Sequence, residues 1–146
     1  MTTSTLKKRG FFYPEMFRGL IEAAIFTNQE VCEDELEDAS IGDFSCSAIA
    51  YLEDYCCQFE AAFPEFCVSP SEYLTRELVN CTELAFIGHD LWLTTCGHGA
   101  GFWDGDWDKS IADTLSDWCR KHGGIELYVG DDQLIYICGK EDYIND

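Results

Sequence analysis

Basic residues are scarce in this chain. Nine Lys and Arg stand against 28 Asp and Glu in 146 residues, which gives a formal net charge of −19. Lys and Arg are absent from residues 19–75 and again from residues 77–108. Because proteins bind phosphate backbones through clustered Lys and Arg, this scarcity argues against direct nucleic-acid binding. A protein partner with a basic surface would be attracted instead.

Long apolar runs and paired cysteine motifs are also absent. No apolar run approaches the length of a membrane span, and residues 10–14 are too short for the core of a signal peptide. We therefore expect a soluble cytoplasmic protein that makes no membrane contact. The nine cysteines include no Cys-x-x-Cys pair, which argues against a zinc ribbon or a thioredoxin-type site. We expect buried thiols in a reducing compartment.

The apolar content is high enough for a folded core. Hydrophobic residues make up 47% of the chain and aromatic residues 14%. The length predicts one domain over residues 1–146, with residues 1–10 as an N-terminal arm. Among the aromatic residues, we expect at least two of Trp92, Phe102, Trp103 and Trp107 to lie in the core, although exposed ones could form a binding hot spot.

Apolar spacing predicts helices and two hairpins. The helices are expected over residues 14–27, from a serine cap at Ser45 or Ser47 to residue 63, over 70–80, and from 107 to 122. Extended structure is expected at 84–87, and hairpins at 90–103, around a turn at 96–99, and at 125–138, around a turn at 130–133. This order predicts an α+β fold, with N-terminal helices packed on a small antiparallel sheet and one inserted helix.

Carboxylates are concentrated between residues 29 and 45, in a run predicted to be a solvated loop or short helix. The central glycine and closing glutamate of an EF-hand loop are absent, so calcium is not expected. Three acidic residues of the following helix, Glu53, Asp54 and Glu60, are expected off its apolar face. The candidate partner-binding residues are Glu30, Glu33, Asp34, Glu35, Glu37, Asp38, Asp43, Glu53, Asp54 and Glu60.

Residues 88–104, with the sequence GHDLWLTTCGHGAGFWD, hold two of the three histidines. His89, Asp90, His98 and Asp104 are candidates for a catalytic or metal site, because imidazole and carboxylate suit acid–base chemistry and transition metals. Their spacing matches no established metal motif, so no metal and no cofactor is expected. The structural alternative is that Asp90 caps backbone N–H groups and His98 stabilises a turn.

Two other chemistries of this segment are weaker. The glycines at 97, 99 and 101 could suggest a phosphate cradle, but the Walker lysine is missing and no strand-to-helix Rossmann pattern surrounds them. Cys96 could be a nucleophile activated by His89 or His98. A thiol that takes no part in chemistry is the simpler interpretation.

The same segment, together with residues 127–132 (LYVGDD), resembles a family of small acidic proteins from bacteriophages and other mobile elements. The resemblance covers most of the chain, including residues 23–27. Family members often carry an Arg-Asn pair between the threonine and the glycine, where this sequence has Thr95 and Cys96. The resemblance implies a phage setting and therefore a bacterial host cell; it supplies no mechanism.

Charge and resemblance together predict a non-enzymatic accessory protein. It would bind and inhibit a host protein through its acidic surface, as a DNA mimic directed against a nucleic-acid-binding or defence protein. One alternative is a small hydrolase or metal-dependent enzyme that uses His89, Asp90, His98 and Asp104. A second is a structural or assembly protein whose acidity serves solubility. The oligomeric state and the host target are left open.

Overall fold

The structure, a computed structural model, describes residues 10–32 and 40–144. Its α-helices are α1 (Pro14–Cys32), α3 (Cys46–Ala62), α4 (Pro64–Val68), α5 (Glu83–Thr95) and α6 (Lys109–Lys121). Two short 3-10 helices, η1 (Ile41–Asp43) and η2 (Pro70–Tyr73), join them. The strands are β1 (Leu127–Val129) and β2 (Ile135–Ile137). The fold is α+β, as the sequence predicts.

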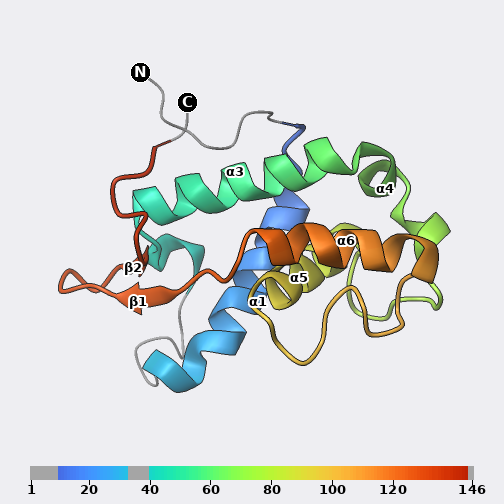
Figure 1. Cartoon of the computed structure of the whole chain (residues 1–146). Helices are drawn as coiled ribbons and strands as arrows, with labels where there is room; N and C mark the ends of the chain where they lie inside the picture. Colours follow the sequence, from blue (N-terminus) through green and yellow to red (C-terminus); the bar gives the residue numbers. More distant parts are fainter. Residues whose placement is uncertain (1–9, 33–39, 145–146) are drawn as a thin grey trace.

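Helix α5 lies inside the helical part, in contact with α1 on one side and α6 on another (Figure 1). The α1–α5 pair is the most extensive contact between elements. Glycine permits this close approach. A Cβ atom at Gly88 would lie 2.1 Å from the carbonyl oxygen of Met16, and one at Gly19 would lie 2.2 Å from that of Ala85. Each side chain would collide with the backbone of the facing helix, so both positions require glycine.

Aromatic rings fill the core between α3, α5 and α6. Phe59 and Phe102 stack with ring centroids 5.6 Å apart, and Phe66 meets the Trp107 ring edge-on at 4.9 Å. Trp92, Phe102 and Trp107 are buried, whereas Trp103 is 45% exposed. The expectation that at least two of these four aromatics lie in the core is confirmed.

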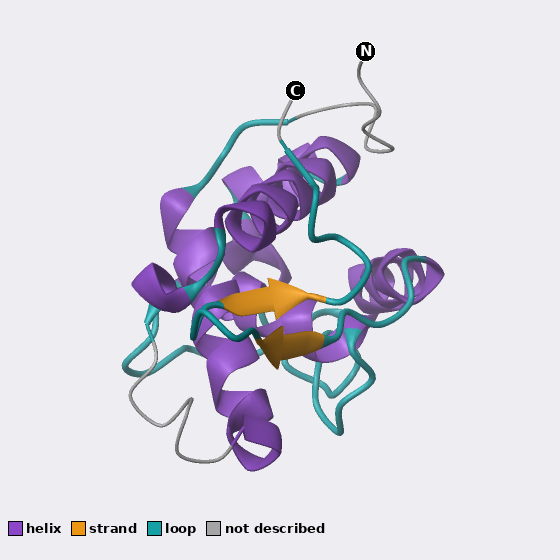
Figure 2. Cartoon of the chain, turned by 90° about the vertical axis from the view of Figure 1, so that its left-hand side faces the viewer, coloured by secondary structure: helices purple, strands orange, loops and turns teal. Residues whose placement is uncertain are grey.

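The two strands form one antiparallel hairpin beside the helices (Figure 2). Leu127 pairs with Ile137 and Val129 with Ile135, as expected for strands at 125–129 and 134–138. Gln133 adopts a positive φ of 69° in the connecting turn, where its N–H donates to the Gly130 carbonyl. Beyond β2, the Ser45 N–H donates to the Ile135 carbonyl at 2.8 Å, which joins the hairpin to the start of α3.

Three helix predictions are confirmed. Helix α1 begins at Pro14 and extends past residue 27. Helix α3 starts after Ser45, whose hydroxyl accepts from the Ala48 N–H at 3.0 Å, and ends just before Pro64. Helix α6 lies where the inserted helix is expected, with Asp108 as its cap and Gly123 after its end at a φ of 71°.

The hairpin predicted at 90–103 is wrong, and so is the extended structure at 84–87. Residues 83–95 form α5, which starts at Thr82, whose hydroxyl accepts from the Ala85 N–H at 3.2 Å. Residues 96–108 form a long loop. Because α5 is buried on several sides, its apolar residues do not follow the 3.6-residue period of an amphipathic helix. The order Leu91, Trp92, Leu93 then has the same pattern as a strand.

The helix predicted over 70–80 is also wrong beyond its first turn. Pro70 does begin η2, but this 3-10 helix ends at Tyr73 and irregular chain follows to Thr82. Ser69 makes no side-chain capping bond. The irregular chain is held instead by the loop after α5, since the Thr75 N–H donates to the Asp106 carbonyl and the Asp108 N–H donates to that of Tyr73. Tertiary bonds therefore replace the helical ladder here.

Candidate functional site

Helix α5 and the loop after it position the predicted site. The helix closes with a Schellman motif: the His98 N–H donates to the Leu93 carbonyl at 2.9 Å and the Gly97 N–H to that of Thr94 at 3.2 Å. Gly97 has a φ of 75°, which explains the glycine at this point. The turn reverses the chain, so that His98 returns toward the helix that carries His89.

His89 and His98 line the same groove, between α1 and the end of α5. The groove has a volume of about 610 Å³, and its other lining residues include Phe26 and Leu93. The His89 Nε2 atom lies 3.1 Å from Oε1 of Glu22. Glu22 comes from α1, and sequence reasoning missed it because only the α1–α5 packing brings residues 67 positions apart together. An imidazole with a carboxylate partner can hold or transfer a proton.

Asp90 follows His89 in the chain but lies in the core rather than in the groove. Its side chain is 3% exposed, and its Oδ2 accepts from the Trp107 indole N–H at 2.7 Å. The pKa of Asp90 is raised to about 7. Burial is the main cause and the charges of Asp104 and Asp106 add to it, whereas the Trp107 hydrogen bond and Arg76 oppose the shift. Asp90 therefore has a structural role, as the structural alternative expects. Its hydrogen-bond partner is the indole of Trp107, however, and not the backbone N–H groups that we expected it to cap.

Asp104 has a local role in the loop. Its carboxylate accepts from the Gly101 N–H at 3.3 Å, and its own N–H donates to the Gly101 carbonyl at 3.2 Å. The four predicted residues therefore fall into two pairs. His89 and His98 share the groove, whereas Asp90 and Asp104 are not among the residues that line it. A hairpin at residues 90–103 could have brought all four together, but residues 83–95 are helical and no such hairpin forms.

Among the side chains that the structure describes, those of residues 10–28 and 40–144, no three from His, Cys, Asp or Glu form a group that could hold a metal ion. The Cys96 thiol donates to the Ile125 carbonyl at 3.6 Å, and burial raises the pKa of this thiol. A raised pKa keeps the sulfur protonated, which is the opposite of an activated nucleophile. The described cysteines, 46, 56, 57, 67, 81, 96, 119 and 138, are all free thiols.

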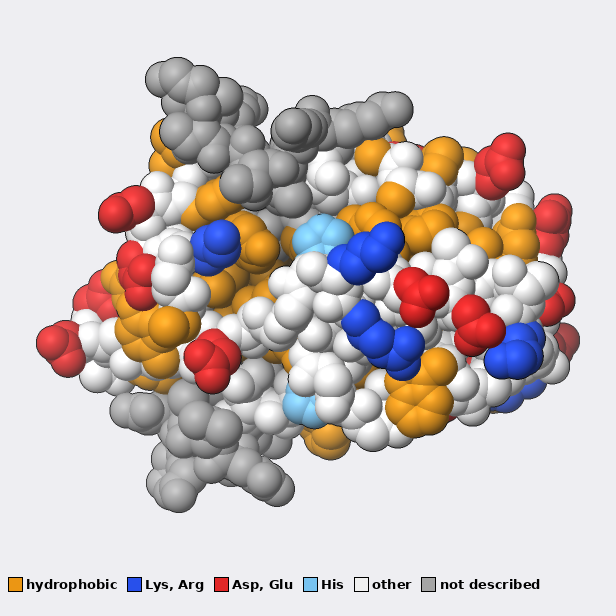
Figure 3. All heavy atoms as spheres, viewed as in Figure 1, with side chains coloured by type: hydrophobic (Ala, Val, Ile, Leu, Met, Phe, Trp, Pro, Cys, Tyr) orange, Lys and Arg blue, Asp and Glu red, His pale blue; other side chains and the backbone are white. Residues whose placement is uncertain are grey.

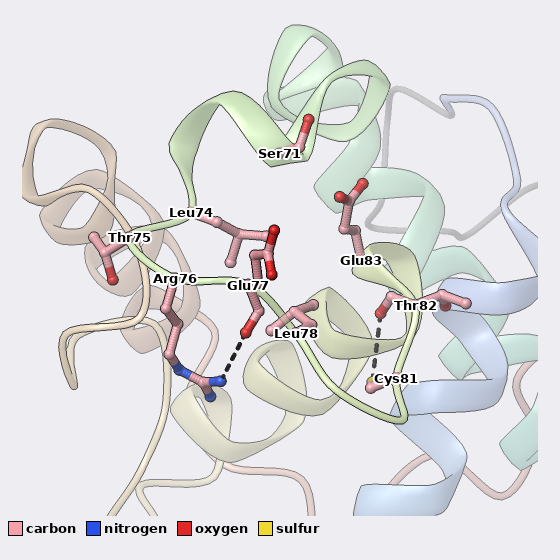
Figure 4. Close-up of a pocket in the computed structure, with 9 residues that line it drawn as sticks. All are labelled: Ser71, Leu74, Thr75, Arg76, Glu77, Leu78, Cys81, Thr82 and Glu83. Carbon is pink, nitrogen blue, oxygen red and sulfur yellow. Dashed lines mark hydrogen bonds between the residues drawn. The ribbon is translucent and has the colours of Figure 1, made fainter.

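A second hollow, of about 740 Å³, lies where irregular chain 74–81 meets the start of α5 (Figure 4). Arg76 is one of its lining residues, and the Arg76 Nε atom donates to the Asp106 carboxylate at 2.6 Å. Glu77 and Glu83 line the same hollow. With its one arginine already paired and two carboxylates beside it, this hollow does not favour an anionic ligand.

The candidate partner-binding carboxylates differ in their exposure to solvent, and the structure does not describe all of them. The side chains of Glu30, Glu33, Asp34, Glu35, Glu37 and Asp38 lie outside the part that the structure describes. Asp43 is half-exposed and accepts from the Ser40 N–H at 2.8 Å, and Glu53 is half-buried. The expectation that Asp54 and Glu60 lie off the buried face is wrong: they are 4% and 8% exposed.

Both buried acids are bound internally. The Asp54 Oδ2 atom accepts from the Tyr143 hydroxyl at 2.7 Å, and the Glu60 Oε1 atom accepts from the Phe11 N–H at 2.8 Å. Two segments distant in sequence therefore dock on α3 through its carboxylates. Gly10, placed in the predicted arm, is held there too, since its N–H donates to the Cys57 carbonyl at 3.0 Å. Residues 1–9 of that arm lie outside the described residues.

No family model, curated protein or solved structure matches this chain. The resemblance of residues 88–104 to the phage protein family therefore stays a prediction. Among the described residues, no helix is long and apolar enough to cross a membrane.

Proposed function

We propose that this chain is an acidic binding protein that captures a partner with a basic surface. Its concrete form is a DNA mimic that occupies the nucleic-acid-binding groove of a host protein, as an anti-defence or similar inhibitor. The observation that carries the proposal is the excess of 28 acidic over nine basic residues. Such a charge attracts basic surfaces over a distance and raises the rate of association.

Internal ion pairs support the proposal, because they use up much of the positive charge. The distance from the side-chain nitrogen to the carboxylate oxygen is 3.5 Å for Arg18 and Glu15, 2.6 Å for Arg76 and Asp106, 3.3 Å for Lys109 and Asp113, and 3.8 Å for Arg120 and Asp117. Four of the basic side chains are therefore paired with carboxylates of the same chain, which weakens the positive potential around them. The remaining exposed carboxylates are available to an external partner.

The segment from Glu30 to Asp43, with Glu53, is the proposed contact region. The segment holds seven of the ten carboxylates predicted to bind, and no Lys or Arg. On the face seen in Figure 3, by contrast, the acidic side chains of the described residues lie among basic and apolar ones. A contiguous acidic run offers carboxylates in succession, as a nucleic-acid backbone offers phosphates.

The test compares two sets of charge reversals in the full chain. One variant carries Glu33→Lys, Glu35→Lys and Glu37→Lys; its matched control carries Glu65→Lys, Asp113→Lys and Asp131→Lys at exposed positions on other elements. Both change the net charge by the same amount. We expect the first variant alone to lose capture of basic proteins from a bacterial lysate, and the capture to weaken with salt and with added double-stranded DNA.

Equal loss in both variants would show that capture follows net charge only, and unchanged capture in the first would remove the proposed contact region. The enzymatic alternative has less support. Of its four residues, only His89 and His98 share a groove, and Asp90 is committed to Trp107.

A further inference from the structure

The histidine groove is one compartment of a longer trough. Another hollow, of about 570 Å³ and distinct from the one lined by Arg76, adjoins the groove; Thr27 and His98 line both. This second compartment reaches the hairpin, where Ile125 and Tyr128 line it. Thr27 lies at the boundary, because it lines both compartments, and two hydrogen bonds fix its hydroxyl: it donates to the Ala23 carbonyl at 2.9 Å and accepts from the Trp92 indole N–H at 2.9 Å.

The trough leaves apolar surface open to solvent. Phe26 is 74% exposed at the rim of the first compartment, and Tyr128 is 38% exposed at the second. Aromatic rings in such positions are typical anchors of protein interfaces. Two adjoining compartments with a fixed residue at their boundary suit two side chains of one chain segment better than one compact ligand.

Charge identifies the kind of segment. Glu22 lies at the first compartment, with its side chain 57% exposed, and Glu126 is exposed at the second. Among the described residues, neither compartment is lined by Lys or Arg. Carboxylates at both compartments of an apolar trough complement a segment with apolar side chains in the middle and cations at its ends.

We infer that this trough docks a peptide segment of a partner protein, with two apolar side chains in the compartments and Lys or Arg beside Glu22 and Glu126. The inference rests on the proposed function in that the partner is basic, but the residues that line the trough are different from those of the segment from Glu30 to Asp43. It assigns the two histidines of the motif a role as walls of a binding trough.

The histidines also provide the readout. The chain has only three, and His122 lies at the end of α6 with its ring 4.2 Å from that of Trp118, outside the trough. The probe is a blocked peptide Lys-Phe-Ala-Leu-Lys, titrated to millimolar concentration while the ring-proton NMR signals are followed. We expect saturable shifts of the His89 and His98 signals and none of the His122 signal.

Control peptides separate the two parts of the inference. The peptide Glu-Phe-Ala-Leu-Glu keeps the apolar residues and reverses the charge of both end residues. The peptide Lys-Ser-Ala-Ser-Lys keeps the charged ends and replaces the two large apolar residues. We expect neither control to shift the His89 and His98 signals. Phe26→Ser should weaken binding about tenfold. Glu22→Gln should weaken it about two- to fivefold, the effect of one exposed ion pair. Asp131→Asn, at the hairpin tip, should leave it unchanged.

Three outcomes would overturn the inference: no shift with the first probe, equal shifts with the acidic peptide, or binding unchanged in Phe26→Ser. None of them bears on residues 33–37, whose charge reversal tests the acidic contact region separately. If the charge reversal at residues 33, 35 and 37 abolishes partner capture but the peptide does not shift the His89 and His98 signals, the proposed function is retained and the trough is rejected as a binding site.

Discussion

Helices α5 and α6 have the same length and opposite characters. Each contains 13 residues, but eight are buried in α5 and four in α6. The α6 sequence places Leu115 and Cys119 in the core and Asp113 and Asp117 in water, so its period is visible. The α5 sequence is apolar on several faces and shows none. The comparison teaches that a visible period reports a helix at the surface, and that interior helices must be recognised in another way.

The largest expected effect breaks the packing of α5. Gly88→Ala would place a Cβ atom 2.1 Å from the Met16 carbonyl oxygen and force α1 and α5 apart. We expect a loss of about 3 kcal/mol in the free energy of unfolding, measured by urea denaturation, although alanine is intrinsically the better helix former. Gly99→Ala is the matched control, because a Cβ there meets no atom within 4 Å. Equal stability of the two variants would contradict the close approach.

The second effect concerns the buried acid of α5. The folded-state pKa of Asp90, about 7, exceeds its ordinary value of 3.8. The folded protein therefore keeps a proton that the unfolded chain has released, so the contribution of Asp90 to stability is complete below about pH 4 and is lost as pH rises through 7. An asparagine in place of Asp90 cannot ionise and still offers an oxygen to Trp107.

We therefore expect Asp90→Asn to be about as stable as the parent chain at pH 4 and more stable at pH 8. Since one pKa unit corresponds to about 1.4 kcal/mol, the difference of roughly three between the folded-state and ordinary pKa values of Asp90 limits the gain at pH 8 to about 4 kcal/mol. We expect about half of this, about 2 kcal/mol, because structural relaxation and water penetration reduce the cost of a buried charge. Urea unfolding at the two pH values measures it. Asp113→Asn, on the exposed face of α6, should show no such pH-dependent gain, and a gain there of the same size would assign the effect to general charge repulsion.

A smaller effect is expected at the start of α6. The Asp108 carboxylate accepts from the Ser110 N–H at 3.0 Å as the helix cap. Asp108→Ala should lower the free energy of unfolding by about 1 kcal/mol, and Asp108→Ser should recover most of it. Thermal unfolding followed by circular dichroism is a sufficient measurement. A stable Asp108→Ala variant would show that α6 depends on its buried face alone.

The smallest effect has the opposite sign. Ser116 lies on the buried face of α6, 1% exposed, and its hydroxyl has no hydrogen-bond partner among the described residues. Ser116→Ala removes an unsatisfied polar group and should raise the free energy of unfolding by up to about 1 kcal/mol. Thr114→Ala, at an exposed neighbouring position, is the reference. Destabilisation by Ser116→Ala would reveal a bond that the hydroxyl makes in solution.

Local chemistry made α1, α3, α6 and the final hairpin predictable. Pro14, Ser45 and Gly123 mark ends that neighbouring residues alone determine, and an amphipathic stripe accompanies each of these helices. The helix at 83–95 was hidden because Gly88 and Asp90, poor helix residues by propensity, are there for contacts with α1 and with Trp107. Helix geometry also separates two of the candidate site residues: adjacent positions on a helix point in different directions, so His89 faces the groove while Asp90 faces the core.

The sequence by itself determined the net charge, the caps, the amphipathic helices and the terminal hairpin, because each follows from composition or from residues close together in the chain. Only the tertiary structure decided which polar residues meet. Glu22 reaches His89, Tyr143 reaches Asp54 and Phe11 reaches Glu60 across 67, 89 and 49 positions. No local pattern encodes such pairs, because they exist only once helices such as α1 and α5 have packed.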